Sequence, residues 1–267
     1  MALVPEAEEH YALGHEQERL LSGSGRIEFL RTLSIISRHL PSTGLRIVDV
    51  GGGTGPYALE LARQGHVVDL IDAMPLHIEQ ALGHPDSPLL ASATVGDARA
   101  LPSPDGSVDA VLMLGPLYHL TELSDRALAL REANRVLKPG GLLFVAAISK
   151  HASLFDGYFR GMISDPVFQG IVEQDLLDGQ HRNPTGHPQY FTTTKFHTAA
   201  ELASELSGAG FADEKLFGVE GFSWLLPTLD DVDLSPSGLL MRHLEAVERE
   251  ESILGMSAHL LAVAKKA

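Results

Sequence analysis

Short apolar runs alternate with helix-forming segments through residues 45–150. Runs of β-branched and other apolar residues bounded by turn residues predict buried strands, and apolar positions at helical spacing predict the helices between them. The expected strands are 47–50, 67–72, 93–97, 108–114 and 142–148. Strands that are largely apolar and joined by helical crossovers are typical of a parallel sheet with helices on both faces. The pattern therefore predicts an α/β protein with a doubly wound, mostly parallel sheet.

A helical pattern precedes this region and a more irregular pattern follows it. Residues 1–40 are expected to form an N-terminal helical cap, because apolar residues recur at helical spacing over 26–40. Segments 150–192 and 222–250 interrupt the alternation, and 150–192 is rich in aromatic residues, Gly and Pro. The segment 150–192 is expected to be an insertion over the sheet edge. The remaining expected elements are helices over 198–209 and 239–251 and strands over 215–219 and 257–265.

The composition fits a soluble globular protein, with 44% hydrophobic and 21% charged residues and no cysteine. The longest apolar run, Leu142–Ile148, is far too short to cross a bilayer, and the acidic N-terminus lacks the apolar region of a secretory signal. We therefore expect a cytoplasmic protein without disulfides, folded as a single domain over residues 1–267. The net charge of −15, with scattered basic residues, disfavours nucleic acid as a partner.

The candidate chemistry lies after the first expected strand. Residues 51–55 read Gly-Gly-Gly-Thr-Gly, and Pro56 then opens a helix-forming segment, as proline does well in the first turn of a helix. A glycine turn between a strand and a helix lets a ligand approach bare backbone. Two ligands fit such a turn, a dinucleotide and S-adenosylmethionine (SAM). The glycines alone do not decide, because Pro56 or Ala58 stands where the dinucleotide fingerprint has its third glycine or alanine.

Five segments in order resemble the motifs of class I (Rossmann-like) SAM-dependent methyltransferases. Residues 49–55 resemble the D/E-x-G-x-G-x-G motif, and Asp72 resembles the acid that ends the second strand and binds ribose. Residues 96–98 resemble the segment that contacts adenine. Residues 108–111 resemble the fourth strand, with Val108 where Phe is usual, and 135–141 resemble the turn before the fifth strand. The further segment 115–120 is similar to bacterial small-molecule methyltransferases of the methyltransferase type 11 kind.

This resemblance implies a seven-stranded sheet with an antiparallel last strand, N-terminal helices and a lid insertion. It implies a SAM-binding core over 45–149, with 150–192 and 222–250 as lids on the substrate side. The implied activity is transfer of a methyl group from SAM to an O, N or C atom of a small-molecule acceptor by in-line displacement.

The resemblance also implies a set of cofactor-binding residues, which are Tyr11, Arg19, Asp49, Gly51, Gly53, Asp72, Ala73, Asp97, Ala98 and Leu114. A carboxylate at Asp72 can accept two hydrogen bonds from the ribose diol. Asp97 can accept from the adenine amino group, and Ala98 supplies a backbone N–H.

The methionine half of SAM is zwitterionic, which suits the backbone at Gly51 and Gly53 and the acid Asp49. The N-terminal segment that closes over SAM in related folds carries Tyr11, Glu16 and Arg19. Arg19 is expected either to pair with the methionine carboxylate or to lie exposed on the surface.

His119 and Tyr118 are the expected catalytic residues. The methyl group of SAM is already activated, so a general base is needed only when the acceptor must lose a proton. His119, just after the fourth strand, is either that base or a structural histidine, and Tyr118 lines the transfer site or packs on the adenosine. No metal is expected, because the spacing of His181, His187 and Asp178 matches no ligand template.

The identity of the acceptor does not follow from the sequence. Candidates for lining its pocket are Tyr158, Phe159, Arg160, Tyr190, Phe191, His197 and Trp224. The alternatives to a small-molecule methyltransferase are a non-catalytic SAM-binding regulatory protein, a nicotinamide-dependent oxidoreductase and an RNA methyltransferase. The acidic charge disfavours the last of these. We expect a monomer or homodimer without a nucleic-acid or membrane partner.

Overall fold

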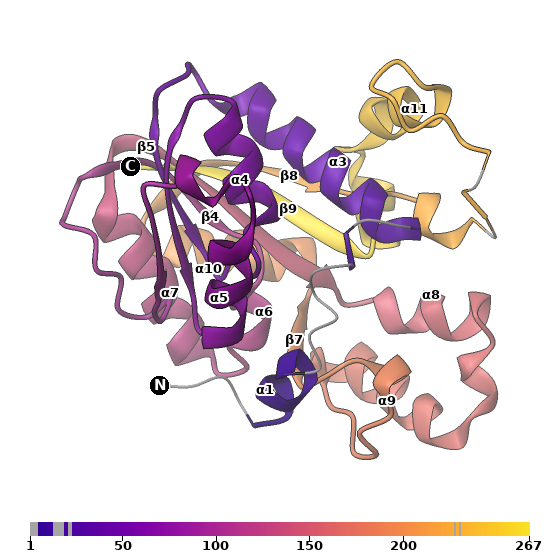
Figure 1. Cartoon of the computed structure of the whole chain (residues 1–267). Coiled ribbons are helices and arrows are strands. Elements are labelled where there is room, and N and C mark those ends of the chain that lie inside the picture. Colours follow the sequence, from indigo (N-terminus) through magenta and orange to yellow (C-terminus); the bar gives the residue numbers. More distant parts are fainter. Residues whose placement is uncertain (1–4, 13–18, 21–22, 227, 230) are drawn as a thin grey trace.

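The central sheet is built around seven strands in the order β3-β2-β1-β4-β5-β9-β8 (Figure 1). The computed structural model describes residues 5–12, 19–20, 23–226, 228–229 and 231–267. The bounds of the seven strands are β1 (Arg46–Val50), β2 (Val67–Asp72), β3 (Ser92–Val95), β4 (Val108–Met113), β5 (Leu137–Ser149), β8 (Phe211–Gly218) and β9 (His259–Lys266). Strands β1 to β5 pair in parallel, and β9 is antiparallel to both β5 and β8. The predicted fold class is confirmed.

Helices cover both faces of this sheet (Figure 1). Successive side chains of a strand point to opposite faces, so Ile47 belongs to the core under α3, α4 and α5, and Val48 to the core under α7 and α10. These helices are α3 (Gly23–His39), α4 (Pro56–Arg63), α5 (Pro75–Gly83), α7 (Leu123–Val136) and α10 (Ala199–Gly208). Burial on both faces explains why the central strands β1 and β4 are largely apolar.

Strand β5 begins earlier than the sequence predicts. The expected turn at 138–141 is an irregularity within β5, where the register against β4 shifts between Val108 and Ala110. Gly140 adopts φ 74° there, a conformation that glycine adopts without strain. The strand therefore runs from Leu137 through the bulge to Ser149 instead of starting at Leu142.

The insertion at 150–192 contains structure that the sequence did not predict. It holds α8 (Ala152–Phe159), α9 (Pro166–Asp178) and the short strand β6 (Gln180–His181). β6 pairs with β7 (Thr194–His197), and β7 pairs in parallel with Ile148 and Ser149 at the end of β5. The insertion is thereby fixed at the carboxyl edge of the sheet, beyond the end of β4.

The helical cap and the second insertion pack differently from each other. Helix α1 (Pro5–Ala12) lies near β7, whereas α11 (Leu239–Val247) packs on α3 through Ile27, Met241 and Leu244 (Figure 1). Residues 1–4, 13–18 and 21–22 of the expected cap lie outside the described residues. The remaining elements are the single turn α6 (Pro116–His119) and 3₁₀ turns at 87–89, 162–164, 188–190, 223–225 and 251–256.

None of the described helices combines the length and apolar character needed to cross a membrane.

Candidate active site

A cavity of about 540 Å³ opens at the carboxyl ends of β1, β2 and β4. It is termed the larger cavity, because a second cavity beside it is smaller. The strand order reverses between β1 and β4, and ligands of doubly wound sheets bind at such switch points. The predicted site residues that line it are Tyr11, Arg19, Gly51, Gly53, Asp72, Ala73, Asp97, Ala98, Leu114, Tyr118 and His119. Asp49 is not part of its wall, and Glu16 lies outside the described residues.

The glycine loop after β1 presents bare backbone to the larger cavity. Gly51, Gly53 and Gly55 adopt φ of 65°, 59° and 84°, which side chains other than glycine rarely adopt. The amide of Gly51 donates to the carbonyl of Ile71 at 2.7 Å and holds the loop against β2. A Cβ on Gly51 would lie 2.4 Å from Cγ of Pro116, so this position has no room for a side chain. The loop is therefore shaped for close approach by a ligand.

The carboxylate of Asp72 is held in place by three donors. The Gly53 amide donates to Oδ2 at 2.8 Å, and the Met74 amide donates to Oδ1 at 2.8 Å. His77 Nδ1 lies 3.0 Å from Oδ1. A carboxylate has about four lone-pair sites, so these bonds orient the group and leave about one acceptor site for a ligand hydroxyl. Asp72 thus joins the glycine loop to the end of β2 as a preorganised acceptor.

Asp72→Ala tests the ribose contact expected from the sequence, and loss of a charged hydrogen bond should weaken the binding of S-adenosylhomocysteine by about 1.5–3 kcal/mol. Titration calorimetry measures the change. Asp69→Ala is the matched control, since Asp69 lies on the same strand but binds Arg46 and Ser92 away from the larger cavity. Equal affinities for wild type and Asp72→Ala would remove Asp72 from the cofactor site.

Asp49 lies behind the glycine loop and not in the cavity wall. It is fully buried, and a Cβ on Gly52 would lie 2.6 Å from its Oδ2. Burial, and secondly the charge of Asp72, raises the pKa of Asp49 to about 7, although the amide of Ala58 opposes this change. Asp49 therefore contacts the inner side of the loop and does not line the larger cavity.

Asp97 is paired with an arginine that the sequence prediction missed. Its carboxylate accepts from the Arg99 backbone amide at 2.9 Å and from the Arg99 guanidinium at 2.9 and 2.7 Å. Burial tends to raise the pKa of Asp97, but hydrogen bonds from Arg99 hold it well below its usual range. Arg99 also binds Asp125 at 2.7 Å. The sequence signal that could have identified Arg99 is its position two residues after Asp97, a predicted site acid.

His119 and Tyr118 lie on α6, directly after β4. The hydroxyl of Tyr11 lies 2.7 Å from Nε2 of His119, and their rings meet edge to face at 5.3 Å. The Tyr118 ring lies 4.7 Å from that of His119, and the Phe191 ring lies 6.3 Å from it. The imidazole is therefore buried among aromatic rings beside the larger cavity, with a phenol as hydrogen-bond partner.

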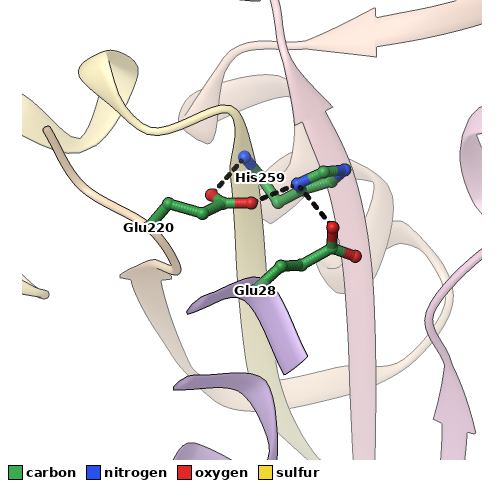
Figure 2. A group of neighbouring side chains, drawn as sticks. All are labelled: Glu28, Glu220 and His259. Atoms are coloured by element: carbon green, nitrogen blue, oxygen red, sulfur yellow. Dashed lines mark hydrogen bonds and ion pairs between the residues drawn. The ribbon is translucent and has the colours of Figure 1, made fainter. Parts of the chain in front are cut away.

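A cluster of Glu28, His259 and Glu220 joins three distant parts of the chain (Figure 2). His259 Nδ1 lies 2.5 Å from Oε1 of Glu220 and 3.9 Å from Oε2 of Glu28. Burial lowers the pKa of His259, but the charges of Glu28 and Glu220 outweigh it and raise the pKa to about 9. Arg19 binds Glu28 at 2.6 and 3.1 Å. The two carboxylates are thus balanced by an imidazolium and a guanidinium.

These three residues also form the group of potential metal ligands found in the described part of the chain, with ligand atoms within 4.8 Å of one another. A metal would have to displace the His259 proton, which the two carboxylates stabilise. The histidines considered from the sequence do not form such a group with Asp178. His181 instead contacts Asp175 at 2.8 Å and the carbonyl of Tyr190 at 2.7 Å.

A second cavity of about 270 Å³, the smaller cavity, lies between the end of β5 and the insertion. It shares Tyr11, Arg19 and Tyr118 with the larger cavity, so these residues form the boundary between the two. Most of its remaining wall comes from the insertion and from the segment around Trp224.

The residues suggested from sequence for an acceptor pocket divide into two groups. Tyr190, Phe191 and Trp224 line the smaller cavity. The others do not line it: Tyr158, Phe159 and Arg160 are exposed, and His197 is buried beside Glu205. Aromatic content alone could not separate the groups, because the division depends on which side chains the tertiary packing turns toward the cavity.

Comparison with known proteins shows similarity to methyltransferases in a family model, in sequence relatives and in a solved structure. The family model described as a methyltransferase domain matches residues 48–145. A ubiquinone biosynthesis O-methyltransferase of Xylella fastidiosa is 32% identical, and the alignment covers 72% of this chain and 71% of the relative. A ubiquinone/menaquinone biosynthesis C-methyltransferase of a Caulobacter species is also 32% identical, over 48% of this chain and about half (53%) of the relative. A SAM-dependent methyltransferase structure from Thermotoga maritima, described as a possible histamine N-methyltransferase, shows the same fold, with 20% identity, a TM-score of 0.62 and coverage of 98% and 99%.

The fold, the switch-point cavity and these similarities agree on one class of protein. The chain belongs to the class I SAM-dependent methyltransferases. It is an enzyme, and its cofactor is SAM and not a dinucleotide. The glycine loop and the Asp72 carboxylate fit this cofactor, because SAM presents a ribose diol and has no pyrophosphate to bind.

Proposed function

We propose that this enzyme transfers the methyl group of SAM from the larger cavity to a small-molecule acceptor in the smaller cavity. The shared boundary formed by Tyr11, Arg19 and Tyr118 carries this proposal. In-line displacement requires donor and acceptor to meet at one place in a fixed orientation, and adjacent cavities supply that arrangement. The relatives named for O- and for C-methylation are equally identical to this chain, so similarity does not select the acceptor atom.

The cofactor roles follow from the lining of the larger cavity. Asp72 accepts from the ribose, Asp97 and Ala98 read the adenine, and the backbone at Gly51 and Gly53 holds the methionine half. Ala73 and Leu114 add apolar wall, and Arg19 and Tyr11 close the site from the N-terminal segment. Asp49 supports the loop from behind. Within a single domain, the core at 45–149 carries this cavity, and the insertions at 150–192 and 222–250 are substrate-side lids.

His119 acts as general base for an acceptor that must lose a proton. Tyr11 lines both cavities, and its hydroxyl lies 2.7 Å from the imidazole, so a hydrogen-bonded path runs from the boundary to His119. Tyr118 forms part of the wall at the point of transfer. Most of the rate enhancement comes from positioning and from exclusion of water, since the methyl group needs no further activation.

The test is acceptor-dependent formation of S-adenosylhomocysteine. The protein is incubated with SAM and a panel of aromatic and aliphatic hydroxyl, amine and carbon acceptors, and the product is measured by chromatography. Turnover that depends on one class of small molecule supports the proposal. Binding of SAM without turnover on any acceptor contradicts it and favours a regulatory protein, and turnover only on a total RNA pool favours an RNA methyltransferase.

A further inference from the structure

Aromatic rings form much of the wall of the smaller cavity, and the polar residues in this wall include Arg19, Ser153, Asp156, Gln189 and His259. The aromatic rings that line it include those of Tyr118, Phe168, Tyr190, Phe191, Phe196 and Trp224. An engineered apolar protein cavity of about 150 Å³ binds benzene. The volume of about 270 Å³ therefore holds one substituted ring or two fused rings. Ring walls favour a planar occupant, because offset-stacked and edge-to-face contacts add to the burial of apolar area.

Phe191 is held in this wall by a strained backbone. Its φ of 60° and ψ of −163° are rarely adopted by a residue with a bulky side chain. Such strain lowers the stability of the fold and clusters at ligand sites. The conformation places the Phe191 ring in the wall of the smaller cavity, 6.3 Å from the rings of both His119 and His181. The fold thus maintains an aromatic ring beside the proposed transfer point at a cost in stability.

Ser153 supplies a polar group without a partner. Ser153 lies on α8 and is 94% buried. It lines the smaller cavity and not the larger one, whereas Tyr118 lines both. Its hydroxyl has no hydrogen-bond partner among the residues that the structure describes. A buried hydroxyl left unpaired destabilises the fold, and a ligand that hydrogen-bonds to it recovers part of the lost free energy.

We infer that the acceptor is a planar aromatic compound of one or two rings with a polar substituent that hydrogen-bonds to Ser153. This rests on the proposed function, since it treats the smaller cavity as the acceptor side. The ring lies between the aromatic walls, and the atom to be methylated points toward Tyr118 at the boundary with the larger cavity. The same wall discriminates against non-planar rings of similar size and polarity.

Catechol and trans-cyclohexane-1,2-diol test the preference for a planar ring, because both carry two neighbouring hydroxyls and only catechol is flat. Each is titrated into the protein saturated with S-adenosylhomocysteine, by calorimetry and by tryptophan fluorescence. Trp224 is the only tryptophan of the chain and lines the smaller cavity, so its emission reports occupancy there. We expect catechol to bind about tenfold more tightly and to change the emission. Equal affinities, or binding without a change in emission, would overturn the inference.

Ser153→Ala tests the polar anchor. The variant is expected to bind catechol about three- to tenfold more weakly, with unchanged affinity for S-adenosylhomocysteine and an unchanged or higher melting temperature. Ser164→Ala is the matched control, because Ser164 is exposed in the same insertion and bonds to Gly161. A lower melting temperature with unchanged catechol affinity would make Ser153 structural. These readouts do not need methyl transfer, so a failure of the proposed function shows separately, as absence of turnover.

Discussion

Replacing His119 with alanine is expected to lower kcat by about 10²–10⁴ on a hydroxyl acceptor that the wild type methylates, the usual contribution of a general base. The physical reason is that the acceptor oxygen is a weak nucleophile until its proton is removed. Affinity for S-adenosylhomocysteine should change little, because the donors around Asp72 and the glycine loop are untouched. Steady-state kinetics and calorimetry give the two quantities.

Two further measurements separate catalysis from a structural role. Added imidazole should restore part of the turnover of His119→Ala, since a free base can occupy the vacated space, and His243→Ala on the exposed face of α11 should behave as wild type. Tyr11→Phe should lower kcat by a smaller factor, because it removes the hydroxyl that bonds to His119 and leaves the imidazole in place. Turnover of His119→Ala equal to that of wild type would show that His119 is structural.

The free energy of unfolding is expected to fall by about 3 kcal/mol as the pH rises from about 6.5 to about 9, owing to His259. The folded-state pKa is raised above the unfolded value, so the folded protein binds more protons throughout this window. The stabilisation is complete below about pH 6.5 and lost above about pH 9. Urea unfolding at a series of pH values measures this dependence.

His259→Gln should flatten this pH dependence. The variant keeps a hydrogen-bond donor near Glu220 but lacks the charge that balances Glu28 and Glu220. It should be less stable than wild type below neutral pH, and the difference should vanish above about pH 9. His243→Gln, a change at an exposed histidine, provides the control. Parallel curves for wild type and His259→Gln would show that the imidazolium does not balance this cluster.

Local features of the chain predicted most of the sheet. The first strand, the glycine loop and the helix opened by Pro56 occur where expected, because each rests on neighbouring residues. The start of β5 was wrong, since a Pro-Gly-Gly sequence is compatible with both a turn and a bulge. The β6–β7 pair was missed because its strands are short and their pairing depends on the exposed end of β5.

Most of the predicted site residues could also be identified from local sequence patterns. Asp72 and Asp97 follow strands β2 and β3, and parallel strands bring such positions to one edge of the sheet. The shape of the smaller cavity could not be predicted from the sequence. Its wall combines α1, the end of β5, the insertion and Trp224, and no motif specifies how these parts face one another.

By itself the sequence determined the doubly wound sheet, the bare-backbone loop and the carboxylates at the strand ends, since short-range patterns encode all three. The tertiary structure decided that Asp49 lies behind the loop, that Arg19 binds Glu28, and that Glu28, Glu220 and His259 balance one another. The contact between Glu28 and His259 joins residues from opposite ends of the chain. These residues come together when the helices and loops pack on the completed sheet, so no local sequence pattern predicts their proximity.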